Sequence, residues 1–116
     1  MKPHVRRAIA FIAGRLITGR ASSGLYDYTA GRHIPITGTV TENNISIYDH
    51  DRRAHVGGSL NNIHFYGDGC GAQISIRGNN FNGYDFCGSG HFTGHAQGNV
   101  IWVYDYASSA YFSYLI

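Results

Sequence analysis

The stretch that decides the fold is residues 45–56, Ile-Ser-Ile-Tyr-Asp-His-Asp-Arg-Arg-Ala-His-Val. Apolar and polar side chains alternate on both sides of four turn residues, 50–53, which is the pattern of a β-hairpin with one buried face. Counting from Tyr48, the aspartate at position one pairs with position six, and Tyr48 pairs with His55 at position seven. The hairpin therefore carries an apolar pair on one face and a Tyr–His pair on the other.

The same hairpin recurs five times along the chain. Aligning the sequence on tyrosine gives spacings of 22, 18, 18 and 20 residues, and the eighth residue after each tyrosine is apolar. A period near 20 residues indicates an array of structural repeats. The cross-strand pairs predicted on the polar face are Tyr26/His33, Tyr48/His55, Tyr66/Gln73, Tyr84/His91 and Tyr104/Tyr111. We call this set the Tyr/His ladder, and it is the candidate binding surface.

The joints between hairpins are predicted to be turns as well. Asn43-Asn44, Asn61-Asn62 and Asn79-Asn80 recur 18 residues apart, and Gly98-Asn99 takes their place before the fifth hairpin. These residue types suit two-residue turns because they tolerate positive φ. The aspartate that follows four of the five tyrosines stands where its side chain can accept hydrogen bonds from turn N–H groups. Close backbone approach is predicted at five glycines assigned to strands, Gly57, Gly58, Gly78, Gly83 and Gly94.

The sequence thus predicts a mostly β fold in which residues 24–116 form an antiparallel meander of about ten short strands. We expect the five hairpins to close around an axis, because an open sheet leaves two unpaired edges. Residues 1–23 are expected to form a basic amphipathic helix and its connector, which covers one end and folds as a single unit with the repeats. Apolar residues at helical spacing in this segment are Val5, Ala8, Ile9, Ile12 and Leu16.

Composition and charge narrow the classes of function. The chain has 116 residues, 43% hydrophobic and 14% charged, with a net charge of +2. It is too short for a β/α barrel of roughly 250 residues. Residues 1–20 hold five cations and no acid, which fits a contact between this head and the acidic body, or attraction to nucleic acid or an anionic lipid surface. Nucleic acid is not expected, since the body lacks basic residues beside its aromatics.

The N-terminal apolar run bears on localisation. Residues 8–14 are barely as long as the apolar part of a signal peptide, and Arg15 interrupts them, whereas a transmembrane span needs about 20 apolar residues. We expect a cytoplasmic location and no transmembrane span. Cys70 and Cys87 fall at neighbouring positions of successive hairpin loops, which fits either a disulfide or two free thiols. The expected compartment favours free thiols.

No motif names a reaction. His33, His55 and His91 share one ladder position, but no Cys-x-x-Cys, no helical His pair and no carboxylate at a fixed offset supports a metal site. Residues 67–71 are glycine-rich but no helix follows them, so they are not a phosphate-binding loop. Paired carboxylates and nucleophile–base spacings do not recur. We therefore expect no enzyme activity, no cofactor and no metal.

The repeat also carries a family resemblance. The iterated hairpin, clearest at 45–56, is joined by Asn-Asn pairs and follows a basic helix that ends Gly-Arg-Leu-Ile-Thr-Gly at 14–19. Over residues 5–116 this resembles bacterial proteins with the 4-fold β-flower domain, which implies a radial arrangement of hairpins and no assigned activity. The chain has five tyrosine-anchored units rather than four. Residues 26–32 are also similar to one YD repeat of toxin-shell proteins. The recurring Tyr-Asp-turn-Gly order is similar to that of choline-binding cell-wall repeats. Those repeats have paired tryptophans, whereas this chain has Trp102 alone.

Three functions fit these patterns. The first is a non-enzymatic binding or interaction module that presents the Tyr/His ladder to a protein, peptide or glycan, since tyrosine and histidine offer flat amphipathic surfaces. The second is a structural homo-oligomer assembled through the helix or the aromatic face. The third is a carbohydrate- or cell-wall-binding repeat protein. Exposure of the ladder favours binding, and its burial favours structure.

Overall fold

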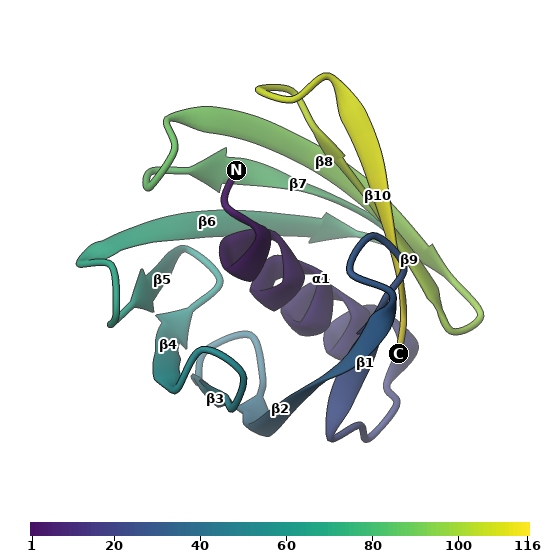
Figure 1. Cartoon of the computed structure of the whole chain (residues 1–116), viewed down its shortest axis with the longest axis horizontal. Helices are drawn as coiled ribbons and strands as arrows, with labels where there is room; N and C mark the ends of the chain where they lie inside the picture. The colour runs from purple at the N-terminus through teal and green to yellow at the C-terminus, as the bar shows by residue number, and fades with distance from the viewer.

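The ten strands form one closed antiparallel barrel in which sequence neighbours are also neighbours in space (Figure 1). The structure is a computed structural model that describes all 116 residues. The first strand pairs with the last, so the predicted closure of the meander is confirmed. The elements are α1 (Pro3–Thr18), β1 (Gly24–Asp27), β2 (Arg32–Val40), β3 (Ile45–Asp49), β4 (Ala54–Ser59), β5 (Asn62–Phe65), β6 (Cys70–Arg77), β7 (Asn80–Asp85), β8 (Gly90–Gln97), β9 (Val100–Asp105) and β10 (Ala110–Leu115).

Four of the five hairpins have the predicted register. Their ladder pairs face each other as Tyr26/His33, Tyr48/His55, Tyr84/His91 and Tyr104/Tyr111. The aspartate after each of these tyrosines accepts hydrogen bonds from main-chain N–H groups of its own turn, at 2.8 to 3.1 Å. The last turn residue of each is in the left-handed region, as Gly31, Arg53, Ser89 and Ser109. The aspartates therefore recur for a structural reason.

The third hairpin is displaced by two residues, and the predicted pair Tyr66/Gln73 is wrong. Its strands pair His64 with Gly71, whereas Gln73 faces Tyr84 on the following hairpin. The structural unit therefore begins at His64, and Tyr66 takes the position two residues further on, inside the turn. Tyr66 misleads the alignment because it falls on the 18-residue period.

The joints at the other end of the barrel also differ from the Asn-Asn prediction. The two-residue turns are Leu60-Asn61, Gly78-Asn79 and, as predicted, Gly98-Asn99. Gly78 and Gly98 have φ of 60° and 63°, so in these two turns glycine supplies the left-handed conformation. Asn62 and Asn80, the second residues of two predicted Asn-Asn turns, begin β5 and β7 instead. Gly78 thus lies in a turn and not in a strand. Residues 41–44 form a four-residue loop in place of a two-residue turn.

Helix α1 runs through the barrel instead of covering one end, as Figure 1 shows. Every residue from 5 to 14 is buried. Side chains alone just fill a barrel of about eight strands, so a ten-stranded barrel has room for a helix. The result is one core of 23 buried residues from both helix and strands. The helix is too short and too polar to cross a membrane.

Two buried arginines explain why a helix that reads as amphipathic is buried on all sides. The Arg7 Nη2 atom lies 2.7 Å from the carboxylate of Asp49. The Arg6 Nε–H donates to the hydroxyl of Tyr114 at 3.0 Å, and its guanidinium lies 3.5 Å from the ring centroid of Phe112. Burial raises the pKa of Tyr114 to about 12, so this hydroxyl keeps its proton. The predicted contact between the basic head and the acidic body is confirmed.

A disulfide joins Cys70 at the start of β6 to Cys87 in the β7–β8 loop, with the Cα atoms 5.2 Å apart. The sequence placed the two residues close together, but the expectation of free thiols is wrong. Free thiols were expected because the N-terminal segment predicts a cytoplasmic location, and the geometry of the loops did not enter that prediction.

Candidate functional site

The ladder positions lie on the outer surface of the barrel. The key tyrosines of the four regular hairpins are half-buried, and their partners His33, His55, His91 and Tyr111 are exposed. Each key aromatic also contacts a second aromatic two residues later, with ring centroids 4.5 to 5.0 Å apart. These outer aromatics are Tyr28, His50, Tyr66, Phe86 and Tyr106. The alignment missed them, although an aromatic residue two positions after the key residue recurs in every hairpin.

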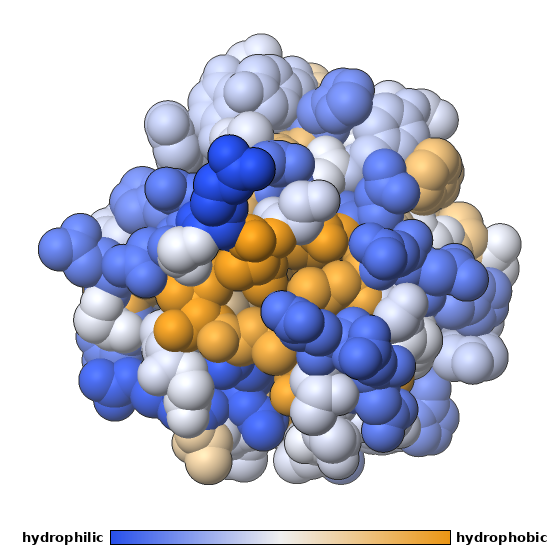
Figure 2. All heavy atoms as spheres, turned by 180° about the vertical axis from the view of Figure 1, so that it is seen from behind, coloured by the Kyte–Doolittle hydropathy of each residue, from blue (hydrophilic) through white to orange (hydrophobic).

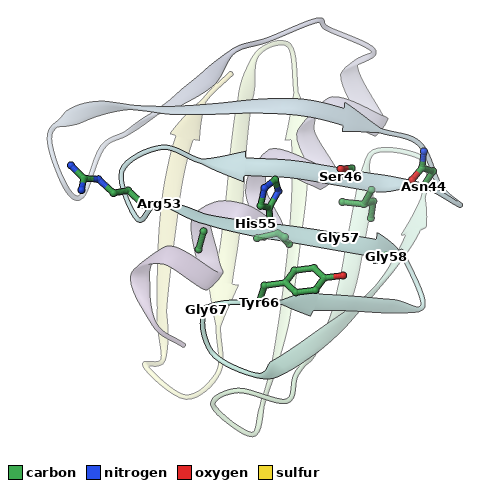
Figure 3. A pocket seen from close by; sticks show the side chains of 11 residues that line it. Asn44, Ser46, Arg53, His55, Gly57, Gly58, Tyr66 and Gly67 are labelled. Atoms are coloured by element: carbon green, nitrogen blue, oxygen red, sulfur yellow. The ribbon is translucent and has the colours of Figure 1, made fainter.

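A hollow of about 650 Å³ opens on this outer surface over β3 and β4, beside the β5–β6 turn (Figure 3). The outward residues there are Ser46, Gly57 and His64, which face one another across β3, β4 and β5. Gly57 has no side chain and Ser46 has a short one, so β3 and β4 present no large side chain at this place, and the Tyr66 ring lies against Gly57. The predicted close approach at Gly57 is confirmed, because a Cβ atom there would lie 3.3 Å from the carbonyl oxygen of Ile45 on the neighbouring strand.

Two aromatic side chains border the hollow. Tyr66 is 64% exposed, and its ring is held edge-on by His64 with centroids 4.5 Å apart. A Cβ atom on Gly57 would lie 3.4 Å from Tyr66 Cε2, so the tyrosine ring borders the bare position closely. His55 packs edge-on against Tyr48 at 4.9 Å. Figure 3 shows the His55 ring, on β4, and the Tyr66 ring, at the start of the β5–β6 turn, on the same side of the sheet.

The two ends of the hollow are polar. Asn44 and Ser46 stand at one end and Arg53 at the other (Figure 3). Arg53 is exposed and forms no ion pair. No carboxylate and no cysteine lines the hollow, so it lacks an acid–base pair. Its chemistry is that of flat aromatic faces with hydrogen-bond donors and acceptors at both ends.

The aspartates near the hairpin loops are engaged in structural contacts. Burial alone would raise the pKa of Asp68, but the hydrogen bond with His4 at 2.6 Å and the charges of His4, Arg52 and Lys2 hold this pKa below its usual range. The pKa of Asp51 is lowered in the same way by the two 2.8 Å hydrogen bonds from Arg32. These carboxylates hold the loops and the helix together.

The candidate metal ligands are not brought into one open site. Asp68 lies near Cys70 and Cys87, with the ligand atoms within 4.8 Å of one another, but both sulfur atoms belong to the disulfide. The ladder histidines stand on three different hairpins, in β2, β4 and β8. No family model, curated protein or solved structure matches the chain.

Proposed function

We propose that this chain is a non-enzymatic binding module and that the hollow at Gly57 is its binding site. The observation that carries the proposal is an exposed tyrosine, Tyr66, beside a position without a side chain, at the one hairpin that departs from the repeat. Local departures from an otherwise consistent pattern are concentrated at functional sites. The resemblance to the β-flower proteins is a separate prediction, and this proposal does not depend on it.

The chemistry of the hollow favours a glycan as ligand. A sugar ring presents C–H groups on its faces and hydroxyl groups at its rim. The Tyr66 and His55 rings suit the faces, and the amide of Asn44 and the guanidinium of Arg53 suit the hydroxyl groups. An open cleft with a few convergent polar groups is typical of small-ligand sites. Arg53 also allows a sugar that carries an anionic substituent. The alternative of a carbohydrate-binding repeat protein is thus included in this proposal.

A structural homo-oligomer is the second candidate, and exposed aromatic side chains on the outer surface favour it. Tyr28, Phe86, Tyr106 and Tyr111 are all more than half exposed, at 52%, 56%, 53% and 67%. Because α1 fills the barrel, assembly would use this aromatic face and not the helix. The measurement is sedimentation of the full chain at increasing concentration, where a constant monomeric mass argues against this candidate.

The compartment is also a matter of proposal. The short apolar run at residues 8–14 favoured the cytoplasm, whereas the Cys70–Cys87 disulfide is typical of an oxidising compartment. We propose that the chain works where this disulfide persists.

The experiment compares two tyrosines of equal exposure. A glycan array identifies a retained sugar, and titration calorimetry then measures its affinity for the wild type, Tyr66→Ala and Tyr111→Ala. Tyr66 is 64% exposed and Tyr111 is 67% exposed, so both substitutions remove a similar surface. We expect Tyr66→Ala to weaken binding by about tenfold or more, as at an aromatic hot spot, and Tyr111→Ala to have little effect. Equal losses in both variants, or no sugar retained by the wild type, would contradict the proposal.

A further inference from the structure

One end of the barrel carries an apolar face that the proposed glycan site does not use. It is the end where α1 finishes and where the turns Leu60-Asn61, Gly78-Asn79 and Gly98-Asn99 lie. Figure 2 shows apolar side chains gathered at this end inside a polar surround. The half-buried apolar residues there, which we call the apolar end face, are Leu16, Ile17, Val40, Leu60, Ile76 and Ile116.

These side chains belong to the last turn of the helix and to the strands and turns around it, and all of them pack against the core. The Ile116 N–H donates to the carbonyl oxygen of Asn99 at 2.8 Å, and a Cβ atom on Gly14 would lie 3.1 Å from Ile116 Cδ1. A hollow of about 270 Å³ opens beside Leu60 and Ile76. One side of each residue contacts the core, and the other side is left to solvent.

Three arginines stand at the same end, and none of them has an ionic partner. Arg15, in the last turn of α1, donates to the carbonyl oxygen of Ser22 at 3.3 Å, and Arg20 and Arg77 are exposed. No salt bridge involves any of the three. Glu42 is the one acidic side chain at this end, and the terminal carboxylate of Ile116 is a second negative charge there. The apolar end face is therefore accompanied by cations that the protein itself does not neutralise.

The opposite end is arranged differently. There three of the four exposed cations, Lys2, Arg32 and Arg52, each lie within 4.0 Å of an aspartate carboxylate, and Arg53 is the fourth. Six aspartates stand near the hairpin loops, against the one glutamate at the apolar end. Unpaired arginines beside an exposed apolar face are thus a feature of one end of the molecule.

We propose that the apolar end face docks on an anionic lipid bilayer. Apolar side chains enter the boundary between headgroups and acyl chains, and Arg15, Arg20 and Arg77 contact the anionic headgroups. A second copy of the chain fits this face less well, since two such faces in contact would bring unpaired arginines against one another. The docking is peripheral and leaves the hollow at Gly57 on the side of the barrel.

The test is co-sedimentation of the full chain with vesicles of phosphatidylcholine alone or mixed with phosphatidylglycerol. We expect binding to the mixed vesicles only, with release by added salt. Each basic residue near an anionic surface contributes about a fivefold gain in partitioning. Arg77→Glu removes one such gain and adds a repulsion, so we expect a loss of about tenfold or more. Arg32→Glu is the matched control, with the same charge change at the opposite end and an expected effect within about twofold.

A second variant tests the apolar part of the contact. Leu60→Asn replaces the side chain in a two-residue turn, where asparagine is well tolerated, and we expect it to weaken vesicle binding while the circular dichroism spectrum is unchanged. The proposal is overturned if the wild type ignores the anionic vesicles or if Arg77→Glu and Arg32→Glu lose binding equally. A concentration-dependent rise in mass that Leu60→Asn abolishes, without vesicle binding, would assign the face to a second copy and also overturn it.

Discussion

Replacing both cysteines by serine removes the covalent link between β6 and the β7–β8 loop. The bonded residues are separated by 17 positions, and closing a loop of this size in the unfolded chain stabilises the folded state by about 3 kcal/mol in the chain-entropy model. The entropy of unfolding for a chain of this length is roughly 0.24 kcal/mol per kelvin, so the loss lowers Tm by about 13 °C. We therefore expect the variant Cys70→Ser/Cys87→Ser to remain folded at 25 °C but to melt well below the wild type.

The assay is thermal denaturation followed by circular dichroism, with and without a phosphine reductant. The reductant should lower the Tm of the wild type to nearly that of the double variant and should leave the variant unchanged. Cys87 is half-buried against the core, so a small remaining difference between reduced wild type and variant measures the packing of the sulfur atom. The reasoning is refuted if both treatments shift Tm by less than about 3 °C, or if the purified, unreduced protein titrates with two free thiols.

Three further predictions concern the barrel. Phe11→Ala empties a fully buried position on α1 and should lower the free energy of unfolding by about 3–5 kcal/mol in a denaturant titration. In Gly83→Ala the new methyl group would collide with a carbonyl oxygen of the neighbouring strand β6. In Gly90→Ala the methyl group would lie 3.6 Å from the Cβ atom of Ala107, which is an ordinary contact. Only Gly83→Ala should therefore lack the circular dichroism spectrum of the folded protein. Because the folded-state pKa of Asp68 is lowered, its contribution to stability is present above about pH 3.9 and is lost as the pH falls through the lower folded-state value. Stability measured against pH should therefore fall more steeply at acid pH in the wild type than in Asp68→Asn.

The hairpin array could be predicted from the sequence because each unit specifies itself locally. Tyr48 and His55 are seven residues apart, and Asp49 bonds the N–H groups of its own turn. Four turn residues and an alternating pattern then leave one register that keeps the apolar face inward. Closure followed from the cost of open edges, which depends on the length of the meander and not on any particular contact.

The burial of the helix could not be predicted in the same way. Arg6 and Arg7 read as a solvated face, since an unpaired charge is costly to bury. Their partners Tyr114 and Asp49 are 108 and 42 positions away, and only the closed barrel brings them to the helix. The size of the interior is likewise set by the number of strands that close, which local spacing does not determine.

The third hairpin shows where a repeat can be misread and why the candidate site lies there. A shift of two residues preserves the alternation of side chains, so the apolar pattern fits a unit that begins at His64 as well as one that begins at Tyr66. The turn decides between them, because Gly69 and not Gly71 takes the left-handed conformation. In the predicted register Tyr66 would be a key tyrosine, and the key tyrosines of the other hairpins are half-buried. In the observed register it is an outer aromatic, 64% exposed and next to Gly57. The displacement that spoils the alignment is therefore the same displacement that places Tyr66 at the border of the hollow, and it depends on a turn that closes two residues early.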